Sequence, residues 1–267
     1  MSDSFFILCL LIECVHAFPA SSQVFYDSEN LPQYCEPEVV NIAELVDPMI
    51  NYRPEKAYIH DADRVIQNCR NCNQDLKKND ACWLGKSSKI PIKNLEISFR
   101  FNKSLQIHNI TIQFCTPRPK AMRILKSVDN GKTWNNLQYF ANDCKGAYNL
   151  TTNTKQKEHL PVCTDKYSQF IPLRKTIFPT LKGRPSAFKL QNSSDLIEYT
   201  SATDIKIVFN EMFFSDSERK VLPYIYGISD ININGRCICY GHASRCNFNQ
   251  MKKRFECVCK HNTKGLD

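Results

Sequence analysis

The carboxyl-terminal part of the chain most constrains how this protein folds. Residues 235–267 contain five cysteines, many polar residues and few large apolar side chains. A segment this short cannot bury enough apolar surface to fold by packing alone. The sequence therefore predicts a small crosslinked module at residues 237–267, which follows a larger domain at residues 18–236.

The amino terminus indicates the compartment in which those crosslinks form. Phe5 to Ile12 is an unbroken apolar run, Glu13 follows it, and Ala17 is a small residue at the expected cleavage point. This layout predicts a secretory signal peptide at residues 1–17, and a buried amino-terminal strand is the alternative. The run is too short to span a membrane, and no other run approaches the ~20 residues required. We therefore expect a secreted protein of the extracellular space or extracellular matrix.

The 14 cysteines are unusually many for a chain of 267 residues. Removal of the signal peptide leaves seven in the larger domain and five in the module, so each region has an odd number. Thiols oxidise in secreted proteins, which favours disulfides. Zinc is an alternative for Cys69-x-x-Cys72 and for the closely spaced module cysteines. A redox role for Cys69-x-x-Cys72 would need a βαβ setting, which the sequence lacks.

The larger domain shows the period of β-strands. Apolar and polar residues alternate in three segments, with apolar positions at Leu95, Ile97, Phe99, Phe101, Ile110, Ile112, Phe114, Ile205, Ile207 and Phe209. This pattern predicts half-buried strands, and turn signals at residues 129–131 and 182–185 separate them. One helical turn is expected at residues 41–46. Long helical periodicity is absent from the sequence, so the fold class is mainly β, an antiparallel β-sandwich with long loops.

Two surface features point to extracellular chemistry. Sequons for N-glycosylation occur at Asn102, Asn109, Asn149 and Asn192. The formal net charge is +8, which attracts acidic partners such as sulfated glycosaminoglycans, and nucleic acid is not expected outside the cell. Lys252, Lys253 and Arg254 form the candidate glycosaminoglycan-binding cluster, because such cations make charge-assisted hydrogen bonds to sulfates. The alternative is an ordinary solvated basic surface.

Catalytic patterns are not evident in the sequence. The six histidines show no HExxH spacing, and neither a GxSxG nucleophile motif nor a phosphate-binding loop occurs. We therefore predict that the protein is not an enzyme.

Specific motifs resemble a known family. Gly235-Arg-Cys-Ile-Cys-Tyr-Gly-His-Ala-Ser-Arg-Cys246, followed by Cys257-Val-Cys-Lys-His-Asn-Thr-Lys-Gly265, resembles the start of a laminin-type EGF module. Ser127-Val-Asp-Asn-Gly-Lys-Thr-Trp134, Gly183-Arg-Pro-Ser-Ala187 and Ala202-Thr-Asp-Ile-Lys-Ile-Val-Phe209 resemble segments of netrins. In netrins a laminin N-terminal domain, a jelly-roll β-sandwich, precedes the first EGF module. The resemblance implies that residues 18–236 are such a domain and that residues 237–267 are an incomplete first module.

The resemblance also implies a disulfide pattern and a metal. The implied pairs are Cys237–Cys246, Cys239–Cys257, Cys82–Cys115 and Cys144–Cys163, with Cys69–Cys72 expected because residues 36–68 lack cysteine. Cys259 would pair with a cysteine just beyond Asp267. Netrin N-terminal domains hold a structural calcium ion, for which Asp75 and the carbonyl groups of Ala81 and Ser229 are the candidate ligands. The alternative for Asp75 is a solvated loop carboxylate.

Two functions compete at this level. The resemblance implies a secreted netrin-like ligand for axon guidance and cell migration, which binds receptors with immunoglobulin or fibronectin-type ectodomains and also heparan sulfate. The alternative is a laminin-like basement-membrane protein that associates through its N-terminal domain with laminin.

Overall fold

The computed structural model describes residues 25–26, 32–33, 36–51, 83–84, 94–114, 118–152, 157–165, 175–211 and 226–258. The strands are β1 (Phe25–Tyr26), β2 (Pro32–Gln33), β3 (Val40–Asn41), β4 (Met49–Asn51), β5 (Trp83–Leu84), β6 (Leu95–Phe114), β7 (Ala121–Ser127), β8 (Asn135–Ala141), β9 (Cys163–Thr164), β10 (Lys175–Pro179), β11 (Ser201–Glu211), β12 (Gly227–Cys237), β13 (Cys246–Asn249) and β14 (Arg254–Cys257). The helical elements are η1 (Ile42–Leu45), α2 (Cys144–Tyr148), η3 (Ala187–Asn192) and α3 (Ser194–Thr200).

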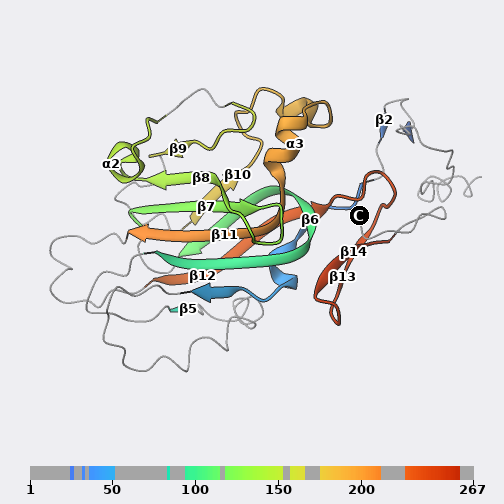
Figure 1. Ribbon diagram of the computed structural model, residues 1–267, viewed down its shortest axis with the longest axis horizontal. Helices are drawn as coiled ribbons and strands as arrows, with labels where there is room; N and C mark the ends of the chain where they lie inside the picture. The colour runs from blue at the N-terminus through green and yellow to red at the C-terminus, as the bar shows by residue number, and fades with distance from the viewer. Residues whose placement is uncertain are drawn as a thin grey trace, which may run out of the picture.

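One long strand, β6, organises the fold. Its first half pairs with β4 on one side and β11 on the other, whereas its second half pairs with β10 and β12. The pairing with β11 shifts register between Arg100 and Leu105, and Asn102 adopts a positive φ of 54° within this stretch. Such an irregularity bends a strand. β6 therefore contributes to both layers of a sandwich, in which β6, β11, β7, β8 and β12 run side by side (Figure 1).

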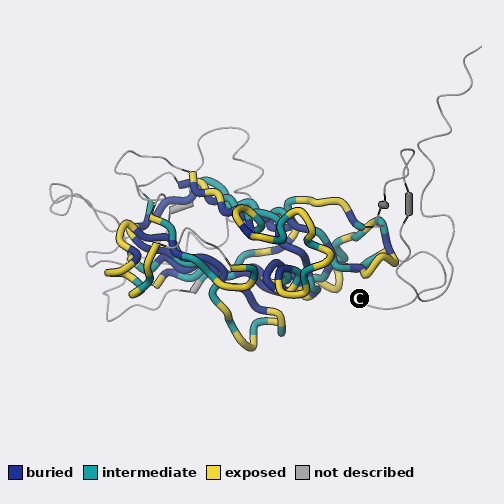
Figure 2. The backbone as a smooth tube through the Cα atoms, turned by 90° about the horizontal axis from the view of Figure 1, so that it is seen from above, coloured by how far each residue is buried: buried dark blue, intermediate teal, exposed yellow. Residues whose placement is uncertain are grey.

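The core lies between the two layers. Phe114 of β6 meets Phe209 of β11 edge to face at 5.7 Å between ring centroids, and Phe140 of β8 meets Phe178 of β10 at 6.3 Å. Edge-to-face contacts of this kind add to the stabilisation that burial of the rings supplies. Figure 2 shows buried backbone through the middle of the body and exposed residues mainly around its periphery.

The predicted alternation is confirmed in these strands. All ten apolar positions named from the pattern are buried, from Leu95 in β6 to Phe209 in β11. The two alternating segments at the start and end of β6 are one continuous strand, because the bend at Asn102 keeps the intervening residues in the sheet. The fold class, a mainly β sandwich, is therefore as predicted.

The expected turns are also present. η1 forms the helical turn predicted at residues 41–46, and the side chain of Asn41 caps it by accepting a hydrogen bond from the Ala43 N–H at 3.3 Å. In the turn between β7 and β8, Asn130 and Gly131 have φ values of 57° and 81°. Hydrogen bonds from Ser127 and Thr133 lower the pKa of Asp129 in this turn.

One strand pair departs from a purely antiparallel sandwich. β9 pairs with β8 in parallel, with Cys163 opposite Tyr139. A disulfide between Cys144 and Cys163 explains this arrangement, because it returns the chain to the edge of β8 after the loop that begins with α2. No helix among the described residues is long and apolar enough to cross a membrane.

Candidate interaction site

The carboxyl-terminal module and the sandwich share a packed junction. β12 runs from the sandwich into the module and ends at Cys237, which lies opposite Leu105 of β6. Phe255, on the β13–β14 hairpin, is 3% exposed and meets Phe101 of β6 at 6.3 Å and Phe248 at 5.0 Å between ring centroids. The hairpin therefore contributes a ring to the main hydrophobic core, and it lies against β6 at the end opposite α2 (Figure 1).

Hydrogen bonds reinforce this junction. The Asn102 side-chain amide donates to the Lys253 carbonyl at 2.9 Å, and the Ile238 N–H donates to the Ser104 carbonyl at 3.2 Å. The β6 bend thus donates one hydrogen bond to the module, through Asn102, and accepts one from it, at Ser104. Asn tolerates a positive φ better than most residues, so Asn102 combines the backbone geometry of the bend with a contact across the junction.

Two disulfides crosslink the described part of the module. They join Cys237 to Cys246 and Cys239 to Cys257, as the resemblance implied. The sulfur atoms of Cys239, Cys246 and Cys257 lie within 4.8 Å of one another. That grouping is compatible with the zinc alternative by distance alone, but these sulfurs are bonded to other sulfurs and are not free thiolates.

The basic cluster at the hairpin tip is partly neutralised. Glu256 Oε1 accepts from Lys252 Nζ at 3.1 Å and pairs with Arg254 at 2.7 Å. Hydrogen bonds from Asn249, Arg254 and Lys252 lower the pKa of Glu256 to about 2. Among the described carboxylates, none forms an ion pair with Lys253, which makes it the most available cation of the three. The sequence pattern did not reveal Glu256 as their partner.

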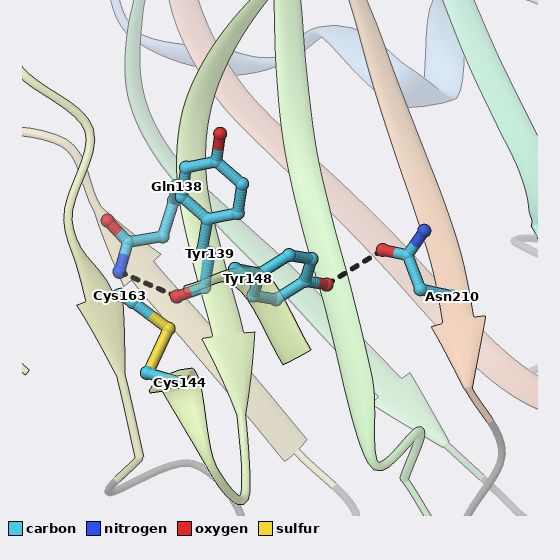
Figure 3. The surroundings of a disulfide bond; sticks show 6 residues. All are labelled: Gln138, Tyr139, Cys144, Tyr148, Cys163 and Asn210. Atoms are coloured by element: carbon cyan, nitrogen blue, oxygen red, sulfur yellow. Dashed lines mark hydrogen bonds between the residues drawn. A yellow bond between two sulfur atoms is a disulfide. The ribbon is translucent and has the colours of Figure 1, made fainter. Parts of the chain in front are cut away.

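A third disulfide lies at the opposite end of the sandwich. Cys144 at the start of α2 joins Cys163 of β9, and both are buried beside Ala121 and Ala141 (Figure 3). Next to it the Tyr148 hydroxyl donates to Asn210 Oδ1 at 2.7 Å, and the Tyr148 ring contacts the Tyr139 ring at 4.8 Å. Burial raises the pKa of Tyr148. These contacts hold α2 against β8 and β11.

A buried arginine anchors the segment between β10 and α3. Arg184 is 4% exposed, and its guanidinium donates to the carbonyl groups of Thr180, Lys157, Glu158 and Leu160. The same group stacks on the Tyr199 ring at 3.6 Å from its centroid, and burial lowers its pKa. The Tyr199 hydroxyl donates to the Leu137 carbonyl at 2.6 Å. Sequence reasoning noted Gly183-Arg-Pro-Ser-Ala187 only as a resemblance and missed this role of Arg184.

The four sequon asparagines lie in different settings. Asn102, Asn149 and Asn192 are exposed, whereas Asn109 is half-buried within β6. Asn109 Oδ1 accepts a hydrogen bond from Asn234 Nδ2 at 2.8 Å. Asn149 ends α2 with a φ of 54°, and Asn192 is the last residue of η3.

The candidate calcium ligands are described only in part. Ser229 lies at a register shift of β12, between Ile228 and Asp230, and its hydroxyl is buried without a hydrogen-bond partner among the described residues. β5 places Trp83 opposite Ile228, the residue before Ser229. Asp75 and Ala81 lie outside the described residues, as does Cys259. The predicted signal peptide at residues 1–17 and the predicted pairs Cys69–Cys72 and Cys82–Cys115 also fall outside them.

Comparison with known proteins defines the class. The family model for the laminin N-terminal domain, domain VI, matches residues 48–235. This range begins just before β4, runs into β12 and ends two residues before Cys237. The chain therefore belongs to the laminin N-terminal domain family, whose members are structural and not enzymatic proteins.

Similar curated proteins are laminin gamma subunits. The chain is 30% identical to laminin subunit gamma-1 of Danio rerio and of Homo sapiens, over 90% of this chain and 17% of each relative. It is 28% identical to the laminin-like protein lam-2 of Caenorhabditis elegans, over 94% of this chain and 18% of that protein. The chain thus spans about a sixth of the length of these relatives.

Solved structures show only distant likeness. The family 32 carbohydrate-binding module of Clostridium perfringens NanJ, solved in complex with galactose, is 11% identical with a TM-score of 0.36, over 73% of this chain and 97% of that chain. The amino-terminal domain of the single-strand break repair protein XRCC1 is 12% identical with a TM-score of 0.36, over 69% of this chain and 97% of that chain. Likeness at this level carries no functional information.

Proposed function

We propose that this protein is an extracellular, laminin-like component of the basement membrane that associates through its N-terminal domain with the N-terminal domains of laminin chains. The observation that carries this proposal is the match of residues 48–235 to the laminin N-terminal domain, together with gamma subunits that align over 90% of the chain. The packed junction supports it, because a module fixed to the sandwich presents the domain in one orientation relative to whatever follows.

A netrin-like guidance ligand is the second candidate. Its support is the set of sequence segments that resemble netrins, among them residues 127–134 and 183–187. Binding measurements separate the two candidates. The secreted chain is immobilised and tested against laminin N-terminal domains and against netrin receptor ectodomains, with calcium and with a chelator. Association with laminin domains alone supports the first function. Receptor binding without laminin association would overturn it and favour the guidance ligand.

Heparan sulfate is a proposed partner of the basic hairpin. Glu256 competes with sulfate for Lys252 and Arg254, since both already pair with its carboxylate. We expect Lys253→Ala to weaken retention on a heparin column and Glu256→Gln to strengthen it, because the latter frees two cations. The control is Lys182→Ala, which removes an exposed cation outside the hairpin. Equal elution of Lys253→Ala, Lys182→Ala and the unchanged protein would contradict the proposal.

We also propose a structural calcium ion with Asp75 and the carbonyl groups of Ala81 and Ser229 as its ligands. Its support is the strand pairing that puts Trp83 opposite Ile228, and the buried Ser229 hydroxyl without a described partner. Bound calcium would cross-link these segments through oxygen ligands. We expect a chelator to lower the melting temperature of the unchanged protein, and Asp75→Asn to lower it while abolishing the chelator effect. A chelator that leaves the melting temperature unchanged would refute the site.

A further inference from the structure

One aromatic side chain on the sandwich is completely exposed. Phe188 of η3 is 102% exposed, so its ring buries no surface against the protein. Burying such a ring ordinarily contributes about 1.5–3 kcal/mol, which is unrealised here. The other apolar residues of the same short element, Ala187 and Leu190, are only half-exposed. Phe188 therefore stands out from its own segment.

The segment that carries Phe188 is firmly anchored. Arg184 ties the preceding turn to four carbonyl groups, and the Ser186 N–H donates to Glu158 Oε1 at 2.7 Å. At the other end Ser193 caps α3 by accepting from the Leu196 N–H at 3.3 Å. The segment is held at both ends, so the exposure of Phe188 is not a consequence of missing local structure. The ring is presented at a defined place on the surface.

A glycosylation sequon ends the same element. Asn192 is exposed and lies four residues after Phe188, and the sequon is completed by Ser194, which is also exposed. Lys189 breaks η3 with non-helical backbone angles between the two residues, so the helical rise does not set their separation. Four residues of even fully extended chain span at most ~14 Å. The phenyl ring on one side and an asparagine side chain with one attached sugar on the other can together bridge such a distance.

Sugar and ring are chemically complementary. One face of N-acetylglucosamine presents C–H groups, and the face of a phenyl ring carries negative electrostatic potential that attracts them. The contact also removes apolar surface from water. The sugar hydroxyl groups remain in solvent, as a bulky solvated group requires.

The other sequons lack this combination. The Asn102 amide already donates to Lys253, and Asn109 lies within a paired strand with its oxygen bonded to Asn234. Asn149 is exposed, but the Tyr148 ring beside it packs on Tyr139. Only the sequon at Asn192 shares an element with a fully exposed aromatic side chain among the described residues.

We propose that Asn192 carries an N-linked glycan whose first N-acetylglucosamine packs on the ring of Phe188. The glycan thus covers an apolar side chain that the protein itself leaves in water. The proposal concerns the surface over η3 and is independent of the module and of the partner that the domain binds. It requires only that the chain passes through the secretory pathway.

A double-mutant cycle tests this contact. The full chain is secreted from cells that glycosylate proteins, in four forms: unchanged, Phe188→Ala, Ser194→Ala and both together. Ser194→Ala removes the sequon but leaves Asn192, Phe188 and the Ser193 cap in place. Glycopeptide mass spectrometry measures occupancy of Asn192, and thermal unfolding measures stability before and after trimming to a single N-acetylglucosamine. We expect high occupancy, and a melting temperature that Phe188→Ala lowers only when the glycan is present.

A second measurement keeps the result independent of stability. In the trimmed protein, stacking on the ring shifts sugar proton resonances upfield, and Phe188→Leu, which keeps an apolar side chain without a ring current, abolishes the shift. An unoccupied Asn192 overturns the proposal. The proposal is also overturned if the effects of Phe188→Ala and Ser194→Ala on the melting temperature are additive and no ring-current shift is seen. Phe188 would then be a contact for a protein partner.

Discussion

Replacement of Arg184 by alanine is expected to destabilise the sandwich by about 1.5–3 kcal/mol, because the loss of hydrogen bonds from a charged group leaves buried carbonyl groups unpaired. The guanidinium donates to four carbonyl groups of residues 157–160 and 180, and the variant leaves these acceptors without their donor. The Tyr199 ring loses the group stacked at 3.6 Å. Chemical denaturation monitored by circular dichroism measures the loss.

Arg184→Lys distinguishes charge from geometry. Lysine keeps the positive charge but lacks the planar fork that stacks on Tyr199 while donating in several directions. We expect it to recover less than half of the lost stability. Lys182→Ala is the matched control, because Lys182 is an exposed cation two residues away, and surface substitutions usually change stability by less than about 0.5 kcal/mol. An Arg184→Ala variant as stable as Lys182→Ala would show that the carbonyl groups find other donors.

The sequence predicts the sandwich because its strands bury one face. Leu95, Ile97 and Phe99 are buried and alternate with polar residues in the sequence. Alternation with a period of two residues indicates a half-buried β-strand. The same information does not show that β6 is continuous through Asn102. Asn102, which has a positive φ, donates a hydrogen bond to the Lys253 carbonyl of the module hairpin, and that contact spans 151 residues of sequence.

Interactions between distant polar residues are similarly hidden from the sequence. Arg184 reads as one more surface cation in a basic chain, and its burial follows only from the path of residues 157–160 over Tyr199. Glu256 reads as an isolated acid, although it pairs with two of the three candidate heparan-binding cations. The disulfide pairs Cys237–Cys246 and Cys239–Cys257 were accessible only through the motif resemblance, since cysteine counts leave many connectivities open.

Phe255→Ala is expected to release the hairpin of the module from the sandwich. The ring is 3% exposed between Phe101 and Phe248, and truncation of a buried phenylalanine costs about 3–5 kcal/mol. The two disulfides keep the hairpin covalently closed, so the loss falls on the contact with β6 and on its hydrogen bond from Asn102 to Lys253.

Trypsin reports this release directly. Lys252, Lys253 and Arg254 lie at and beside the hairpin tip, and cleavage there requires the chain to leave the turn in which Lys253 has a φ of 50°. We expect Phe255→Ala to accelerate cleavage after these residues at least tenfold. The digestion is carried out under conditions in which the sandwich stays folded, as shown by the absence of cleavage within β7 and β11. Mass spectrometry of the reduced digest identifies the sites.

Met251→Ala is the matched control for the hairpin. Met251 is 97% exposed at the same tip, so its truncation removes a large side chain without touching the junction. We expect its digestion rate and stability to equal those of the unchanged protein. If Phe255→Ala and Met251→Ala are cleaved equally slowly, the Asn102 hydrogen bond and the two disulfides suffice to hold the hairpin on β6. In that case the aromatic contact is not what fixes the module against the sandwich.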